Sequence, residues 1–476
     1  MIKYTKIVAT IGPETALPKK INSLYKAGMD VARLNGSHNS LEWHKKTINK
    51  LRKQLPMVPI LLDIPGKKIR TENLRKEPSF EVNDEIILTC DKNYSGLTKI
   101  PITNKKLYFY LKKGVKILAD DGTLSFIVEK VIKKDIYCRC LNKGKLRSKK
   151  GINVPNIFIK QELLSQRDKK FLNFAKECEV DFIGISFVES KKHIEKIRKF
   201  LNSENPKIMA KIENMPGLKN KEEIIESSDA IMIDRGDLSV ETDLDSIAIS
   251  QKEIISKANL YSKPVIVATE MLHSMIDNPF PTKAEVTDIS NSVLDGCSAT
   301  MLSGETAIGK FPEESVKKMK EVSNVSSIHV RKEKFQDNGK VNKDVIKNYM
   351  AEAVAHLCKS TPITKVVAIT KSGFAARALS LLRIPQPIIA VSDDIKNSRT
   401  FNLFPGTQGI FLDIAFSKKN TDHIILCLKK LWKMNLLTSK DIVVVIGLSY
   451  PKSGNRFNHI QLHSIDDLVQ ILGWKK

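Results

Sequence analysis

The sequence predicts an α/β protein: a (β/α)8 TIM barrel with an all-β lid domain inserted after its third strand, followed by a doubly wound α/β domain. Short apolar runs alternate with polar helical stretches over residues 5–70 and again from residue 182. Between these regions, residues 72–165 show short alternating strand patterns broken by turn residues. A second alternation of helix and strand patterns begins near residue 348 and predicts the last domain.

Eight apolar runs are the expected barrel strands, because three precede the insertion and five follow it. Helical stretches around 21–27 and 40–55 separate the first three, which is the rhythm of parallel strands with right-handed crossovers. A capping-box pattern at Thr282–Glu285 predicts the start of a later helix. The eight strands are expected at Ile7–Ile11, Val31–Leu34, Ile60–Asp63, Phe182–Ile185, Ile208–Ile212, Ala230–Ile233, Val265–Ala268 and Ala299–Leu302.

The domain limits follow from these patterns. Residues 1–71 and 166–340 are expected to form the barrel domain, and residues 72–165 the inserted β-barrel lid domain, with strands such as Glu85–Leu88 and Ser125–Val128. Polarity and charge rise through Val330–Lys347, which predicts a linker there. Residues 341–476 are then expected to form the last α/β domain, with strands that include Val366–Ile369 and Ile442–Ile446.

Composition narrows the class of protein. A chain of 476 residues is too long for a single hydrophobic core. Its net charge of +25 is spread along the chain, which favours a lysine-rich bias with some steering of anionic ligands over one nucleic-acid-binding patch. Seven cysteines without paired zinc-ligand spacing fit a reduced compartment, and neither a signal peptide nor a membrane-spanning run is apparent. We therefore expect a cytoplasmic protein.

Two charged groups stand where apolar runs end: Lys211-Ile212-Glu213-Asn214 and Arg235-Gly236-Asp237. The carboxyl ends of barrel strands are where such folds carry their chemistry. Two carboxylates offer oxygen ligands to Mg²⁺, and an adjacent lysine offers a fixed positive charge, which together suit phosphoryl transfer. A structural salt-bridge cluster is the alternative interpretation of the same residues.

Nine motifs in order resemble those of the pyruvate kinase family. They are Thr5–Pro13, Val31–His38, Leu62–Thr71, Ala119–Gly122, Lys149–Pro155, Lys211–Asn214, Arg235–Leu238, Lys263–Met275 and Met301–Ala307. The resemblance implies a barrel, a lid and a C-terminal domain, and the transfer of phosphoryl from phosphoenolpyruvate to ADP in glycolysis, giving ATP and pyruvate. It also implies Mg²⁺ or Mn²⁺ as cofactor and a homotetramer, without nucleic-acid or membrane partners.

The resemblance assigns roles to individual residues. Lys211, Thr269 and Arg70 are the implied catalytic residues, with Thr269 relaying a proton through water. The implied substrate-binding residues are Arg33, Lys211, Gly236, Asp237 and Thr269, and the nucleotide-binding ones Arg33, His38 and Lys150. Glu213 and Asp237 are the implied ligands of the divalent metal. A monovalent-cation site is implied at Asn35, Ser37, Asp63 and the backbone of Ile64.

Several residues depart from the family pattern. Lys68 stands where potassium-dependent members carry glutamate, so its ammonium would replace K⁺ and K⁺ would not be required. Asp234 replaces the alanine before Arg-Gly-Asp, where the backbone cradles the substrate carboxylate. An Asp234 side chain that faces that carboxylate would weaken substrate binding. One that points outward would change substrate binding little. Glu189 replaces arginine, and this reversal of charge is either paired with the change at Asp234 or adds to its effect. Gly36 replaces phenylalanine.

Alternatives to an active pyruvate kinase stay open. A divergent paralogue that uses another enol phosphate, or has lost turnover, would explain Asp234, Glu189 and Gly36. A basic nucleic-acid-binding protein is motivated only by the net charge of +25. In the last domain, Thr370–Gly373 and Gly447–Gly454 resemble the family's effector phosphate loops, and ordinary strand-to-helix turns are the other interpretation.

Overall fold

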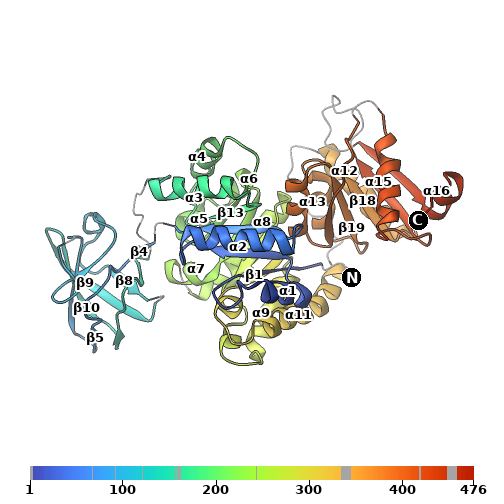
Figure 1. The fold of residues 1–476 in the computed structure, drawn as a ribbon. Helices are drawn as coiled ribbons and strands as arrows, with labels where there is room; N and C mark the ends of the chain where they lie inside the picture. The colour runs from blue at the N-terminus through green and yellow to red at the C-terminus, as the bar shows by residue number, and fades with distance from the viewer. Residues whose placement is uncertain are drawn as a thin grey trace.

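The computed structural model describes residues 4–66, 68–91, 93–120, 122–155, 157, 162–242, 244–333, 345–417, 420–447 and 458–475. Asp121, most of the predicted linker and residues 448–454 of the second effector-like loop therefore lie outside the described residues. Figure 1 shows three parts in a row, with the barrel between the inserted sheet and the C-terminal α/β domain. The exact limits of the three domains stay a prediction.

The central part is a closed barrel of parallel strands, which confirms the predicted fold class. Its order is β1-β17-β16-β15-β14-β13-β3-β2, and β1 pairs with both β17 and β2. Nearly every strand residue is buried, as expected when helices cover the outside and side chains fill the inside. The strands are β1 (Lys6–Thr10), β2 (Val31–Asn35), β3 (Ile60–Ile64), β13 (Phe182–Ile185), β14 (Lys207–Ile212), β15 (Ala230–Asp234), β16 (Val265–Ala268) and β17 (Ala299–Leu302).

Helices follow these strands and bury their apolar faces against the barrel. The predicted capping box is present, because Thr282 accepts from the Glu285 N–H and the Glu285 carboxylate accepts from the Thr282 N–H. The helices are α1 (Pro18–Ala27), α2 (Leu41–Gln54), α3 (Gln166–Glu177), α4 (Lys191–Leu201), α5 (Met215–Lys219), α6 (Lys221–Ser227), α7 (Arg235–Glu241), α8 (Ile247–Leu260), α9 (Lys283–Leu294), α10 (Gly304–Ala307) and α11 (Pro312–Glu333).

The inserted part is a seven-stranded sheet in the order β4-β12-β8-β9-β10-β6-β7, with a separate pair of β11 and β5. Its two edges meet, because Thr71 and Ile102 form an antiparallel bridge and the Thr103 N–H donates to the Arg70 carbonyl at 2.9 Å. Phe126 fills the interior. The strands are β4 (Ile69–Arg70), β5 (Ser79–Phe80), β6 (Glu85–Thr89), β7 (Ile100–Pro101), β8 (Lys116–Ala119), β9 (Leu124–Ile132), β10 (Asp135–Cys140), β11 (Gly144–Lys145) and β12 (Gly151–Asn153).

The C-terminal part is a five-stranded sheet in the order β20-β19-β18-β21-β22, parallel except for β22. Separate hydrophobic clusters lie under helices α12 and α13 and under α15, so helices cover both faces, as in a doubly wound fold. The elements are α12 (Val345–Ser360), β18 (Lys365–Ile369), α13 (Phe374–Leu381), β19 (Ile388–Ser392), α14 (Ile395–Thr400), β20 (Thr407–Phe411), α15 (Asp422–Lys433), β21 (Ile442–Gly447), β22 (His459–Ser464) and α16 (Ile465–Ile471).

The C-terminal domain packs on the amino ends of the barrel strands. The Lys6 ammonium, at the start of β1, donates to the Thr407 carbonyl at 2.7 Å. Arg383 Nη2 donates to the carbonyl of Cys297, which precedes β17, at 2.8 Å. Leu403 is fully buried in the same cluster as the side chains inside the barrel. The carboxyl ends of the strands, at the other end of the barrel, remain available for a site.

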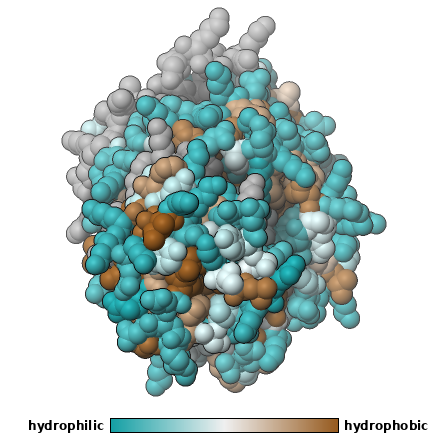
Figure 2. Space-filling model, turned by 90° about the vertical axis from the view of Figure 1, so that its left-hand side faces the viewer, coloured by the Kyte–Doolittle hydropathy of each residue, from teal (hydrophilic) through white to brown (hydrophobic). Residues whose placement is uncertain are grey.

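The surface at the far end of the molecule belongs to the inserted sheet. Figure 2 shows that hydrophilic side chains cover most of this face and that hydrophobic ones form small, separate patches. Val82, Leu97 and Phe109 are among its exposed apolar residues. Such scattered exposure is normal for a folded domain. Within the described ranges, no helix combines the length and apolar character needed to cross a membrane.

Asp441, just before β21, is expected to make the stability of the C-terminal domain depend on pH under acidic conditions. Burial raises the pKa of this carboxyl, but hydrogen bonds from Lys365, Thr364 and Thr438 outweigh it and hold the pKa below its ordinary value. A carboxyl whose pKa is lower in the folded than in the unfolded state stabilises the folded protein at pH values above the ordinary aspartate pKa. This contribution is lost as the pH falls through the lower pKa of the folded state.

We therefore expect Asp441→Asn to lower the free energy of unfolding by about 1.5–3 kcal/mol at neutral pH, because it removes hydrogen bonds to a charged group. The difference from wild type should shrink as the pH falls below about 4. Urea unfolding of both proteins across this pH range measures it. A difference that stays constant with pH would contradict the assigned role of the Asp441 charge.

Candidate active site at the carboxyl ends of the barrel strands

The Lys211 ammonium is the centre of a buried charged cluster. Its Nζ lies 3.0 Å from Glu213 Oε1, 3.0 Å from Asp234 Oδ2 and 3.7 Å from Asp63 Oδ2. It also donates to Ser186 Oγ at 3.3 Å. Burial lowers the pKa of Lys211, but the three carboxylates outweigh it and hold the pKa well above its ordinary value. The side chain is 5% exposed and carries its proton at physiological pH.

Three carboxylates form a group that fits a metal ion. One oxygen each of Glu213, Asp234 and Asp237 lies within 4.8 Å of the others. Glu213 is fully buried: its Oε1 pairs with Lys211 at 3.0 Å, and its Oε2 has no hydrogen-bond partner. Burial raises the pKa of Glu213 to about 8, with Lys211 opposing and the other two carboxylates adding to the rise. Such an orphaned buried carboxylate is what a bound divalent cation would satisfy.

Arg33, in the middle of β2, is held by the neighbouring strand β3. Its Nε and Nη2 lie 2.8 Å and 2.7 Å from Asp63 Oδ2, and its Nη1 donates to Thr10 Oγ1 at 3.0 Å. Asp63 is 2% exposed, and its Oδ1 lacks a hydrogen-bond partner. Space for this oxygen depends on Gly184, since a Cβ there would lie 1.8 Å from it. Arg33 and Asp63 thus form one wall of the cluster.

Lys68 reaches the carboxylate group that fits a metal ion. Its Nζ donates to Asp237 Oδ1 at 2.6 Å. The side chain passes over Gly151 of β12, where a Cβ would lie 2.5 Å from Lys68 Cε. Lys68 therefore links the inserted sheet to a carboxylate of the barrel. Its charge adds to the positive potential around Asp237.

The predicted monovalent-cation residues follow two paired strands. Asn35 of β2 is in register with Asp63 of β3. Asn35 Oδ1 accepts from the Ser37 N–H at 3.0 Å, and the Ile64 carbonyl accepts from Ser186 Oγ at 3.1 Å. The fold therefore brings these four residues to one edge of the barrel. Their role in binding a monovalent ion stays a prediction.

Thr269, after β16, sits in an unusual backbone conformation. Its φ is 70° and that of Glu270 is 55°, values that non-glycine residues adopt rarely. Thr269 Oγ1 accepts from the Gly236 N–H at 2.7 Å and donates to the Ala268 carbonyl at 2.5 Å. Arg235 Nη2 donates to the Thr269 carbonyl at 2.8 Å. The first turn of α7 therefore holds the Thr269 hydroxyl next to Gly236.

His38, Arg70 and Lys150 lie where the barrel meets the inserted sheet. Partial burial and the charges of Arg70 and Arg33 lower the pKa of His38, so its imidazole is neutral at pH 7. Arg70 Nη1 donates to the Lys149 carbonyl at 2.9 Å, and Lys150 Nζ lies 2.8 Å from Asp120 Oδ1. Three of the implied phosphate-binding side chains are thus gathered between the two domains.

The departures from the family pattern have identifiable surroundings. Gly36 has no room for a side chain, since a Cβ would lie 2.5 Å from the Asp63 carbonyl and 2.8 Å from Phe171. Glu189 lines a cavity of about 100 Å³ between the barrel and the inserted sheet, together with Glu241. Asp234 does not point outward: it is 5% exposed and pairs with Lys211 inside the barrel. Its departure from the family pattern was the signal that pointed to this position.

Comparison with known proteins identifies the family. Residues 2–316 match the model of the pyruvate kinase barrel domain, and residues 348–463 match that of the pyruvate kinase alpha/beta domain. The pyruvate kinase of Borreliella burgdorferi is 34% identical over 98% of this chain and 98% of its own length. That of Staphylococcus aureus is 35% identical over 98% of this chain and 81% of its own length. Together with the barrel and its cluster, these matches show that the chain belongs to the pyruvate kinase family of phosphotransferases.

Proposed function

We propose that this protein is a pyruvate kinase, which transfers the phosphoryl group of phosphoenolpyruvate to ADP and gives ATP and pyruvate. The observation that carries the proposal is the buried Lys211 ammonium beside Glu213 at the end of β14, with Asp237 near Glu213 in the first turn of α7, directly after β15. Phosphoryl transfer needs fixed positive charge where negative charge develops, and this cluster supplies it without rearrangement of the backbone.

Lys211 would stabilise the transferring phosphoryl group and the enolate oxygen that it leaves. Its ammonium is protonated and held on several sides, so it loses little conformational entropy when a substrate binds. A charged donor in a water-excluded pocket acts more strongly than one in solvent. Arg33, anchored by Asp63, would add a second fixed cation on the same side.

Glu213 and Asp237 would hold Mg²⁺ or Mn²⁺, since the orphaned, buried Oε2 of Glu213 fits such an ion. When bound, the ion supplies positive charge that offsets the substrate's phosphoryl oxygens. The protein's own residues orient the substrate around it. The Gly236 backbone would receive the substrate carboxylate at the start of α7, with the Thr269 hydroxyl beside it to relay a proton through water.

His38 and Lys150 would bind the nucleotide, together with Arg33, and Arg70 would contact the transferring phosphoryl group. Arg70 lies on β4 and Lys150 precedes β12, so both belong to the inserted sheet rather than to the barrel strands. Closure of this sheet over the barrel would bring their charges to the phosphates and exclude water from the reaction.

A divergent paralogue is the second candidate, and the position of Asp234 favours it. The carboxylate of Asp234 lies 3.0 Å from Lys211 Nζ, so it offsets the positive charge that an incoming phosphoryl group needs. Without a compensating cation, this carboxylate would repel an anionic enol phosphate. The second candidate therefore predicts that the protein binds or turns over phosphoenolpyruvate poorly.

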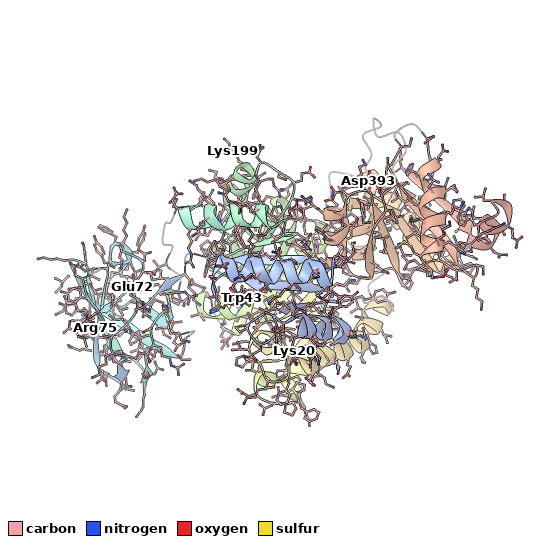
Figure 3. The ribbon with its side chains drawn as sticks, in the orientation of Figure 1. Lys20, Trp43, Glu72, Arg75, Lys199 and Asp393 are labelled. Atoms are coloured by element: carbon pink, nitrogen blue, oxygen red, sulfur yellow. The ribbon has the colours of Figure 1, made fainter. Side chains whose placement is uncertain are left out.

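The distribution of charge favours small anionic substrates over a nucleic-acid partner. Figure 3 places Lys20 and Lys199 on separate helices of the barrel, and Arg75 on the inserted domain. Lys20 is moreover paired with Glu313 at 3.1 Å. A nucleic-acid-binding surface needs basic side chains gathered along one face. We propose a cytoplasmic homotetramer that binds phosphoenolpyruvate and ADP.

The proposal is tested by measuring pyruvate formation from phosphoenolpyruvate and ADP with Mg²⁺, in the presence and absence of K⁺. We expect turnover that does not require K⁺, because the Lys68 ammonium already supplies positive charge at Asp237. Lys68→Glu should make turnover dependent on K⁺, since a carboxylate there leaves a negative position for the ion. No turnover from folded wild-type protein would favour the divergent paralogue.

Retention of the activity of Lys68→Glu without K⁺ would show that Lys68 does not replace the ion. Lys170→Glu serves as the matched control, because this lysine lies on α3, outside the cluster. The control should keep the potassium response of the wild-type protein. Salt-dependent retention on DNA checks the remaining candidate, since binding to phosphates weakens steeply as salt increases.

A further inference from the structure

Asp234 occupies a position from which an aspartate usually caps a helix, yet it does not cap α7. It is the last residue of β15 and the N-cap of α7, and its side chain makes no capping hydrogen bond. Instead the carboxylate turns into the barrel, where it is 5% exposed. Burying a carboxylate is costly unless it is paired, so this orientation indicates a partner inside the barrel.

Asp234 does not have the Lys211 ammonium to itself. The same ammonium also lies 3.0 Å from Glu213 and 3.7 Å from Asp63, so three carboxylates share it. Glu213 Oε2 has neither a hydrogen-bond partner nor an ion pair, although this residue is fully buried and its Oε1 pairs with Lys211. This orphaned oxygen is an independent indication that a further cation belongs beside Asp234.

We propose that Asp234 is a third carboxylate ligand of the divalent metal ion, beside Glu213 and Asp237. Ligand oxygens of these three residues lie within 4.8 Å of one another, a spacing compatible with a shared ion. Mg²⁺ is usually held by one or two carboxylates and completes its shell with substrate phosphates. A third carboxylate lets the protein hold the ion before the substrate arrives.

This inference rests on the proposed function only in so far as that function needs a divalent ion. It also resolves the electrostatic conflict at Asp234. A carboxylate engaged with a divalent cation no longer opposes the approach of an anionic substrate, and Lys211 is shared among fewer anions. With the ion bound, Asp234 therefore strengthens metal binding. Without the ion, its charge would weaken substrate binding.

The test is a titration of substrate-free protein with Mn²⁺, followed by the loss of the electron paramagnetic resonance signal of the free ion. We expect Asp234→Ala to raise the dissociation constant of Mn²⁺ by about tenfold or more. Asp288→Asn is the control, because Asp288 pairs with Arg235 at 2.7 Å but lies outside the carboxylate group. The control should change the constant by less than about threefold, the size of a remote charge effect.

Asp234→Asn keeps the shape of the side chain and one oxygen, so it serves if the alanine variant unfolds. It should weaken Mn²⁺ binding in the same direction and by a smaller factor. Circular dichroism and thermal unfolding establish that each variant is folded. Binding within about threefold of wild type in a folded Asp234 variant, or an equal loss in Asp288→Asn, would overturn the proposal.

The titration needs no turnover, which separates the two hypotheses. If Mn²⁺ binding falls in the Asp234 variants and no pyruvate forms from wild type, the third ligand stands and the proposed function fails. If pyruvate forms and Mn²⁺ binding is unchanged, Asp234 is a counter-ion of Lys211 and this inference alone fails.

Discussion

Replacing Lys211 by methionine is expected to lower the rate of pyruvate formation by about 100- to 1,000-fold or more, because the substitution removes the charge that stabilises the transition state. Methionine retains much of the length and flexibility of the lysine side chain, so packing around β14 changes little. Steady-state kinetics with phosphoenolpyruvate, ADP and Mg²⁺ measure the effect. The loss should appear in kcat as well as in kcat/KM, since the charge acts on the developing phosphoryl group.

Lys207→Met provides the matched control on the same strand. Lys207 is the first residue of β14, at the opposite end from Lys211, and pairs only loosely with the exposed Glu204 at 4.0 Å. It should retain wild-type kinetics. Removing Lys211 also leaves Asp63, Glu213 and Asp234 without their shared cation, so thermal unfolding must accompany the kinetics. Folded Lys211→Met with near-wild-type kcat would refute the proposed role.

Asp181→Ala is expected to destabilise the folded protein by about 3–5 kcal/mol, because it leaves buried cations unpaired. Asp181 is 3% exposed, and its Oδ2 accepts from Arg52 Nη2 at 2.6 Å and from the Ile60 N–H at 2.7 Å. Arg399, from α14 of the C-terminal domain, lies 3.7 Å from its Oδ1. The alanine variant therefore loosens both the start of β3 and the contact between the domains.

The control for Asp181 is Glu179→Ala, which removes a second ion pair across the same contact. Glu179 lies 2.6 Å from Lys396 of α14, but both side chains are largely exposed. Solvent screens such a pair, so its loss should cost less than about 1 kcal/mol. Urea unfolding of the three proteins gives the comparison. Equal effects of the two substitutions would show that burial of Asp181 adds nothing to its ion pairs.

The fold was largely predictable because parallel barrel strands are buried on both sides. Runs such as Ala230–Ile233 and Val265–Ala268 are apolar throughout, and helical periodicity separates them. The site was partly predictable for a related reason. Lys211 interrupts an apolar run and Glu213 follows it. Parallel strands that close into a barrel bring the carboxyl ends of such runs together.

The rest of the site depends on contacts between distant residues, which local patterns do not contain. Gly36 departs from the family pattern, and only the fold shows that Phe171 occupies the space beside it. Lys68 reaches Asp237 because Gly151, on another strand, leaves its path open. The inward turn of Asp234 likewise follows from the shared ammonium of Lys211, which a sequence pattern does not place.

The position of Leu403 limits how the domains of this chain can be exchanged. Its side chain belongs to the inner cluster of the barrel, together with Val31 and Phe182, although it comes from outside the barrel's own sequence. Removing the C-terminal domain would therefore expose an apolar opening at the base of the barrel rather than leave a finished surface. The two domains are not interchangeable modules: a chimera with a relative's C-terminal domain must supply a side chain that fits this opening.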